Sequence, residues 1–291
     1  MRYVTKGGSP AVLDTVDANG LTELDRARAY FVTDGQQSGF DFEIYKRSAI
    51  RNRLRTLFNG KCAYCEFVYD VGYTEDIEHF RPKGRIDVIT PSGISAIYPG
   101  YWWLGSSWDN LLPSCKRCNV AKWLCLYDGT KIKAGKSNFF PLDKEADRAT
   151  VEGAEATETT LLLNPALDDP ADYLTFEIRD GHCIIVPKLA ESTALAFRRA
   201  RTSIDVYGLN RHRLVKQRTE RYTDLKAAIV NLEYVIEYYD WAPEHRKPAI
   251  AEQLRDEKDR IKRSMAAETA HSAMAAWLSA PILNTLGVIA A

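Results

Sequence analysis

Cys62-Ala-Tyr-Cys65 opens the stretch of sequence that decides the fold, and Cys115-Lys-Arg-Cys118 closes it. Each Cys-x-x-Cys pair can hold one edge of a tetrahedral zinc ion from a tight turn, and four thiolates fill every coordination position. The two pairs therefore predict a structural zinc site that ties two distant segments together and takes no part in catalysis.

Between the two pairs lies Glu78-His79-Phe-Arg81-Pro-Lys83, which contains the one histidine of five that falls in this interval. A neutral imidazole near physiological pH can take a proton from water, which makes His79 a candidate general base for hydrolysis. Glu78 offers an oxygen ligand to a hard divalent ion such as Mg²⁺ or Mn²⁺, and the carbonyl of Asn119 offers another. These residues predict a catalytic metal site beside an activated water.

The strand expected around Glu78 sets a condition on that site. Successive residues of a strand point to opposite faces, so Glu78 and His79 reach one site only where the strand bends or ends, and Pro82 makes such an end plausible. In a regular strand, Asp76 becomes the rival metal ligand because it shares a face with Glu78.

Cationic side chains surround these motifs. Arg81, Lys83 and Arg85 follow the base, and Lys116, Arg117 and Lys122 lie around the second cysteine pair. They can hold a phosphodiester backbone without reading its sequence, and Arg81, Lys83 and Lys122 are our candidates for nucleic-acid contact. The alternative is a solvated charged surface. Trp102, Trp103 and Trp108 can stack on bases, but packing beside a small core is the favoured interpretation.

Composition limits the class of protein. The chain has 291 residues, 45% of them apolar, with 39 Lys+Arg balanced by 39 Asp+Glu. Zero net charge means that any basic surface is local. Residues 1–6 lack the apolar core of an export signal and no apolar run spans a membrane, so we expect a soluble, cytoplasmic protein with reduced thiols. Cys125 and Cys183 are expected to be free and buried.

Hydrophobic periodicity predicts the elements around the motifs. Helices are expected over residues 21–32 and 42–58, the second stopped by Asn59-Gly60. Two strands are expected at residues 73–80 and after Gly84, with a loop at residues 91–93. A helix over residues 111–126, carrying Asn119 and Lys122 one turn apart, completes a strand-strand-helix unit.

Downstream, residues 127–160 are expected to form a loop over the core. Residues 173–178 and 182–186 read as a hairpin turning at Asp180-Gly181. Helices are predicted over residues 192–209, 211–239 and 249–280, with a break at Pro243.

The constellation resembles the HNH, or ββα-metal, nuclease family. The resemblance implies that His79 is the general base, that Asn110 in Trp108-Asp-Asn110-Leu orients it, and that Glu78 and Asn119 bind the catalytic ion. Glu78 stands where Asp is commoner, and Asn119 stands where the second His of the family name would be. The implied fold is α+β, a ββα core stapled by Cys₄ zinc and flanked by N- and C-terminal helices.

A closer resemblance is to PtuB-type HNH proteins of Septu and related retron-linked antiphage systems, over about residues 1–213. It includes Leu162-Leu-Asn-Pro165 and Gly208-Leu-Asn-Arg211 as well as the motifs above. It implies a DNA endonuclease effector that works with a PtuA-type ATPase. A stand-alone or restriction-type nuclease and a non-catalytic zinc scaffold stay open as alternatives.

The expected organisation has three parts. Residues 1–60 form an extended segment and helices packed on the core, residues 61–145 form the nuclease core with its zinc knuckles, and residues 146–291 add the hairpin and a helical region.

Overall fold

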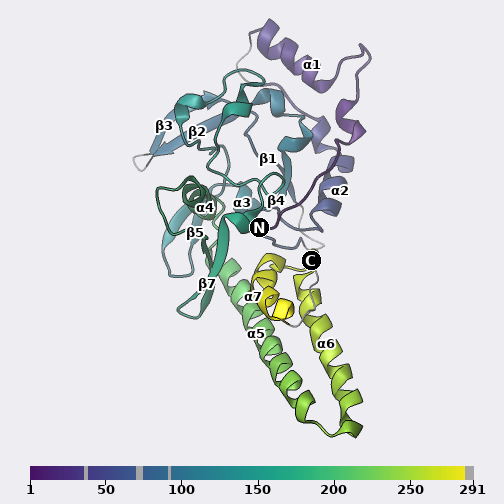
Figure 1. Cartoon of the computed structure of the whole chain (residues 1–291). Helices are drawn as coiled ribbons and strands as arrows, with labels where there is room; N and C mark the ends of the chain where they lie inside the picture. Colours follow the sequence, from purple (N-terminus) through teal and green to yellow (C-terminus); the bar gives the residue numbers. More distant parts are fainter. Residues whose placement is uncertain (36–38, 70–74, 91–92, 286–291) are drawn as a thin grey trace.

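A body of short strands and helices carries a long helical hairpin that projects from one side, as the computed structural model shows (Figure 1). The structure describes residues 1–35, 39–69, 75–90 and 93–285. Two positions of the first predicted strand, 73 and 74, and two of the predicted loop, 91 and 92, lie outside the described residues.

Strands and helices alternate irregularly along the chain. The strands are β1 (Asp76–His79), β2 (Arg85–Thr90), β3 (Gly93–Pro99), β4 (Leu111–Ser114), β5 (Lys122–Cys125), β6 (Lys131–Ala134), β7 (Leu174–Arg179) and β8 (His182–Pro187). The helices are α1 (Glu23–Arg28), α2 (Ser48–Leu57), α3 (Lys116–Asn119), α4 (Leu195–Val206), α5 (His212–Trp241), α6 (Lys247–Met265) and α7 (Ser272–Thr285).

The strands pair two by two in antiparallel sheets: β1 with β4, β2 with β3, β5 with β6 and β7 with β8. In the first sheet Glu78 lies opposite Leu112, and His79 lies opposite Leu111. The strand that pairs with β1 is therefore β4, and the prediction that the strand after Gly84 completes this unit is wrong. That strand forms its own hairpin with β3, which the sequence analysis missed.

The predicted helix over residues 111–126 is also wrong. Its residues form β4, the four-residue helix α3 and β5 in succession. The run Leu111-Leu-Pro-Ser114 is entirely buried and pairs with β1, and short apolar runs fit a buried strand as well as a helix. Pro113 has no N–H to give to a helix, and Asn119 and Lys122 consequently lie on different elements.

Both predicted N-terminal helices are present, but the second begins at Ser48 and not at residue 42, because Arg47 before it is extended. Thr22 caps α1 by accepting from the backbone N–H of Asp25, whose carboxylate reaches back to the N–H of Thr22. Helix α2 ends where predicted, because Asn59 and Gly60 adopt the left-handed conformation with φ of 52° and 64°.

In the second half the β7–β8 hairpin and helices α4 and α5 are confirmed. Asp180 and Gly181 both have positive φ, as the tight turn requires. Two expectations fail: the predicted loop contains β6, and the helix predicted over residues 249–280 is interrupted between Met265 and Ser272. The break ends at His271, whose φ is 55°, and neither Gly nor Pro marks it in the sequence.

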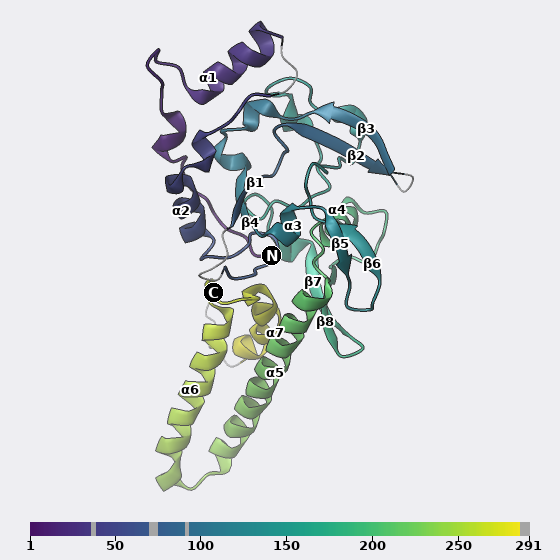
Figure 2. The same cartoon turned by 180° about the vertical axis from the view of Figure 1, so that it is seen from behind.

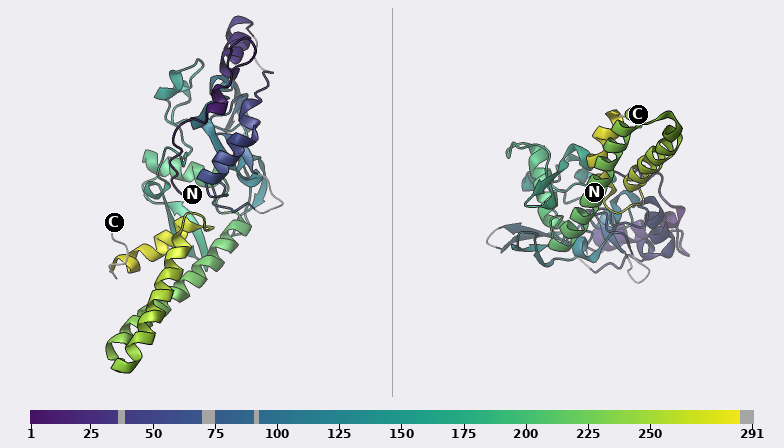
Figure 3. Two further views of the ribbon diagram at one scale, coloured as in Figure 1. Left: turned by 90° about the vertical axis from the view of Figure 1, so that its right-hand side faces the viewer. Right: turned by 90° about the horizontal axis from the view of Figure 1, so that it is seen from below.

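The core has one large and two small parts. The large cluster draws on residues from Met1 to Leu214 and contains all four paired cysteines. The two small clusters lie along α5, α6 and α7. Helices α5 and α6 form the hairpin that projects from the body (Figures 2 and 3). Helix α7 lies at the base of this hairpin, beside α5 and α6 (Figure 1). No helix in the described part of the chain is long and apolar enough to span a membrane.

Candidate functional site

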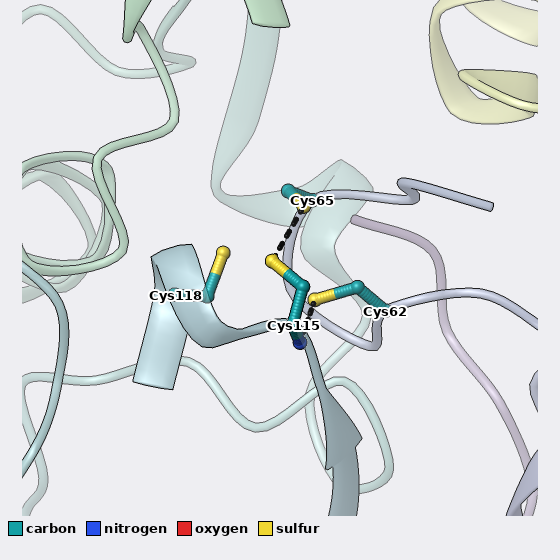
Figure 4. Close-up of side chains that lie close together, drawn as sticks. All are labelled: Cys62, Cys65, Cys115 and Cys118. Carbon is teal, nitrogen blue, oxygen red and sulfur yellow. Dashed lines mark hydrogen bonds between the residues drawn. The ribbon is translucent and has the colours of Figure 1, made fainter. Parts of the chain in front are cut away.

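The four paired cysteines form one buried cluster. The sulfurs of Cys62, Cys65, Cys115 and Cys118 all lie within 4.8 Å of one another (Figure 4). Cys65 Sγ is 3.7 Å from Cys115 Sγ, and zinc–sulfur bonds of about 2.3 Å in a tetrahedron place sulfurs roughly 3.8 Å apart. The thiols therefore fit a metal such as zinc, and the prediction that two distant segments meet here is confirmed.

Arg211, a residue to which the sequence assigned no role, packs against this cluster. Its guanidinium donates to Cys65 Sγ at 3.2 Å and to Cys118 Sγ at 3.6 Å, and the side chain is buried. Four thiolates around a divalent ion leave two negative charges, so a buried cation beside the sulfurs offsets part of that charge. Its motif, Gly208-Leu-Asn-Arg211, was visible in the sequence, but its contact with the cysteines was not.

His79 occupies the last position of β1 and is buried. Its Nε2 lies 2.9 Å from the carbonyl oxygen of Gly105. The ring of Tyr45 packs edge-on against the imidazole, with 4.5 Å between the two ring centres. A carbonyl can only accept, so Nε2 carries the proton and Nδ1 keeps its lone pair. Burial lowers the pKa of His79 to about 3, which keeps the ring neutral near physiological pH.

Asn110 ties the chain just after His79 to the turn that contains Gly105. Its Oδ1 accepts from Arg81 N at 2.7 Å, and its Nδ2 donates to Arg81 O at 2.9 Å and to Leu104 O at 3.2 Å. Leu104 precedes Gly105, so Asn110 holds the turn whose carbonyl orients the imidazole. The buried Lys6 holds the segment that carries Asn110, because its ammonium donates to the carbonyls of Trp108 and Leu111.

Glu78 points into the interior, where it meets a lysine that the sequence analysis did not single out. Lys136 Nζ donates to Glu78 Oε1 at 2.6 Å and to the carbonyl of His79 at 2.9 Å. Both side chains are buried. Burial raises the pKa of Glu78, and the ammonium opposes that shift. Lys136 thus ties a segment downstream of β6 to the end of β1.

Asn119 meets Asp76 across the β1–α3 junction. Its Nδ2 lies 3.2 Å from Asp76 Oδ2. Strand β1 stays in regular register with β4 through His79, the condition under which Asp76 shares a face with Glu78. Gly135, at φ 110°, allows the next segment to approach α3, and Ser137 N then donates to Asn119 O at 2.5 Å.

The three candidate nucleic-acid contacts differ in their surroundings. Arg81 makes an internal ion pair with Glu158 at 3.0 Å and lies over the Tyr101 and Phe140 rings. Lys83 Nζ lies 5.1 Å from the centre of the Phe42 ring. Lys122 is exposed at the start of β5.

Two further predictions concern cysteine and tryptophan. Cys183 is buried as expected, but the expectation for Cys125 is wrong, because its thiol is exposed on β5. The side chains of Trp103 and Trp108 are buried, which confirms packing as their main role.

Comparisons with known proteins place the chain among Septu proteins. It is 37% identical over 234 residues to Septu protein PtuB of Bacillus mycoides (strain KBAB4), an alignment that covers 80% of this chain and 70% of that protein. Septu protein PtuB of Bacillus thuringiensis is 38% identical over 106 residues, which covers 36% of this chain and 34% of the relative.

A third relative is longer. Septu protein PtuA of Bacillus mycoides (strain KBAB4) is 27% identical over 175 residues, which covers 59% of this chain but 20% of PtuA. A search of protein-family models found no match. No solved structure matches the chain either.

Proposed function

The chain belongs to the Septu PtuB family, and from that membership and the surroundings of His79 we propose that it is a metal-dependent HNH endonuclease. We propose further that it is the effector of an antiphage defence complex that also contains a PtuA-type ATPase. The observation that carries the nuclease proposal is the bonded geometry of His79, Gly105 and Asn110 described above.

His79 is proposed as the general base. Its Nε2–H is anchored on Gly105, so Nδ1 takes the proton from the water that attacks the phosphodiester phosphorus. A ring with a pKa of about 3 is neutral but weakly basic. The negative charge of a bound phosphodiester raises that pKa, because an anion near the imidazole favours the protonated ring. The base therefore strengthens when the substrate is in place.

Asn110 is proposed as the orienting residue, because it ties Arg81, two residues after His79, to Leu104, which precedes the Gly105 carbonyl that anchors the imidazole. Asp76, Glu78 and Asn119 supply oxygen donors, the ligand type that Mg²⁺ and Mn²⁺ prefer. A divalent ion bound there would act as a Lewis acid toward the phosphate and the leaving 3′ oxygen. Lys136 holds Oε1 of Glu78 and Asn119 holds Oδ2 of Asp76, so Oε2 and Oδ1 remain for metal binding. Because β1 ends at His79, an ion on these oxygens would reach the water at the imidazole around the end of the strand.

The defence role rests on kinship. One strain of Bacillus mycoides contains both a PtuB and a PtuA that resemble this chain, and both carry the Septu name. A chain with zero net charge gains little DNA affinity from its overall field, which is in keeping with a partner that contributes to substrate binding.

The test is a cleavage assay on the zinc-loaded full chain, with and without a PtuA-type partner. The substrates are supercoiled plasmid and single-stranded DNA in Mg²⁺ or Mn²⁺. We expect His79→Ala to slow cutting by about 10²–10⁴-fold, the usual contribution of a general base. The matched control is His245→Ala, because His245 lies beyond α5 at the far end of the hairpin and is exposed.

The outcomes separate the alternatives. Cutting that needs His79 but no partner indicates a stand-alone nuclease and contradicts the effector proposal. Cutting that appears only with the ATPase supports the effector. No cutting under either condition, by a folded protein that retains zinc, leaves the zinc scaffold as the correct interpretation and overturns the nuclease proposal.

A further inference from the structure

A surface cavity of about 640 Å³ lies beside the cysteine cluster, away from the residues around His79. One wall is the start of α5, with His212 and Arg213, and the other is β5, with Trp123 and Cys125. A backbone bond from Tyr127 N to Asn210 O, 3.2 Å long, holds the two walls together. None of His79, Asn110, Glu78 and Asn119 lines it.

The cavity is cationic. Arg117 contributes from α3, Arg213 from α5, and Arg211 lies against the cysteines behind them. Within the described part of the chain, no acidic side chain lines the cavity, and Arg117 and Arg213 have no carboxylate partner within ion-pair distance. The first turn of α5 adds the positive end of a helix dipole. Arg211 is engaged by the negative thiolates, so the positive charge left to attract an anion is that of Arg117 and Arg213.

Trp123 supplies the second property of the cavity. It is 72% exposed, and among the described residues no aromatic or cationic side chain packs on its ring. Leu124 beside it is buried, so β5 uses its inner face for packing and presents the indole outward. An indole open on its face is a stacking platform for a nucleobase.

We propose that this cavity binds an unpaired nucleotide, with its base on Trp123 and its phosphate between Arg117 and Arg213. Bases in a duplex are already stacked on their neighbours, so the cavity selects a single strand or a free nucleotide. This inference rests on the proposed function, because the cavity would give the proposed nuclease a substrate that contains an unpaired segment.

The experiment measures binding and not cutting. The full chain carrying His79→Ala, loaded with zinc and without other divalent ions, is titrated against a fluorescent dT12 strand, the matching 12-base-pair duplex and dTMP. We expect dT12 to bind more tightly than the duplex, and Trp123→Ala to weaken binding roughly tenfold or more. Trp123→Phe, which keeps a ring, should restore part of the affinity.

The charged wall has its own readout. Arg117→Ala and Arg213→Ala should each weaken binding of dT12, and the double substitution should reduce the slope of log K against log salt by about 0.7, because the two arginines hold one phosphate of a single strand. Matched controls are Trp241→Ala, at the end of α5 and 83% exposed, and Arg255→Ala on exposed α6 surface. Both should bind like the parent protein.

Cys125 offers an independent check. It lines the cavity and is the exposed thiol, whereas the other five cysteines are buried. Bound dT12 should slow its alkylation by iodoacetamide in the parent protein but not in Trp123→Ala.

Competition by dTMP distinguishes the two sources of the nucleotide. Displacement of dT12 by dTMP at comparable affinity identifies a free nucleotide as the ligand, and displacement only at far higher concentration identifies a nucleotide within a strand. The proposal is overturned if neither ligand binds, if the duplex binds as well as dT12, or if Trp123→Ala is without effect. Because the protein carries His79→Ala, none of these results depends on whether the chain cuts DNA.

Discussion

Arg211 illustrates how a single side chain can support a metal site without being a ligand. It reaches the cluster from the turn between α4 and α5 and bonds sulfurs of both cysteine pairs. Arg is suited to this position because its planar fork can serve two acceptors at once and stays charged when buried. Lysine would supply the charge but not the fork.

We predict that Arg211→Met lowers the zinc affinity of the protein by about 10–100-fold, the usual cost of losing a partner of the metal ligands. The measurement is zinc competition with a colorimetric chelator. Arg213→Met is the matched control, since Arg213 is exposed and makes no bond to the sulfurs. Unchanged zinc affinity in Arg211→Met would show that the contact has no role in metal binding.

His271 controls part of the acid stability of the protein. It is buried where α6 gives way to α7, and burial, then the Arg218 guanidinium, lower its pKa to about 4. The Glu66 carboxylate opposes this shift. In the unfolded chain its pKa is about 6.5, so between these values the unfolded state binds a proton that the folded state does not. The contribution of His271 to stability therefore falls as the pH is lowered from about 6.5 towards 4.

We predict that, between pH 7.5 and 5.5, the free energy of unfolding falls about 1.4 kcal/mol more in the wild type than in His271→Asn. Asn removes the titration and tolerates the positive φ at this position. Urea unfolding at the two pH values gives the comparison. Equal losses in both proteins would mean that the pKa of His271 is the same in the folded and unfolded states.

An element of this fold could be predicted from the sequence when its conformation depends on residues close to it along the chain. The Asn59-Gly60 helix stop and the Asp180-Gly181 turn depend on their own backbone conformations, and both predictions hold. Residues 111–126 were misassigned because their conformation depends on β1 and on the cysteine turns, which lie far along the chain. The break before α7 was missed because a histidine, and not a glycine, takes the left-handed position.

The same distinction applies to the candidate site. The cysteine pairs, His79 and Asn110 could be picked out from the sequence, because each belongs to a motif of a few adjacent residues. Lys136 was not predictable, since it reaches Glu78 across 58 residues from a stretch expected to be loop. No local pattern records a buried ion pair between segments so far apart.

The helical hairpin has its own packing. On α5, Leu232 is fully buried against α6 and α7, whereas Val230, two residues earlier, is 39% exposed. The difference follows the helical period, which turns one face of α5 inward and the opposite face to solvent.

We expect Leu232→Ala to destabilise the protein by about 2–5 kcal/mol, because it opens a cavity in a small apolar cluster. Val230→Ala should cost less than about 0.5 kcal/mol. Urea unfolding followed by circular dichroism gives both values, and zinc content should be unchanged. Similar costs for the two substitutions would contradict the packing assigned to α5.

At the scale of the whole molecule, the metal cluster is part of the main core. All four cysteines belong to the large apolar cluster, so a metal bound there stabilises the body and not merely a surface loop. A ligand that binds only the folded state adds to its stability in proportion to the logarithm of ligand concentration.

We predict that each tenfold rise in buffered free zinc above the dissociation constant adds about 1.4 kcal/mol to the free energy of unfolding, less whatever the unfolded thiols bind. Thermal unfolding in zinc buffers measures the effect. Cys118→Ser should abolish most of the dependence, and Cys125→Ser should leave it intact, because Cys125 lies outside the cluster. A melting temperature of the wild type that does not change with zinc concentration would exclude a structural metal.

The contact between Arg211 and Cys118 also sets an order of events during synthesis. The two residues are 93 positions apart, so a ribosome working at about 5–20 residues per second leaves the complete set of thiols waiting roughly 5–20 s before the arginine is polymerised. The nascent chain can capture its metal in that interval, but it does so without the cation that later rests on the sulfurs. We therefore expect the earliest zinc-bound form to hold its metal more weakly than the finished chain, in which Arg211 contacts the sulfurs.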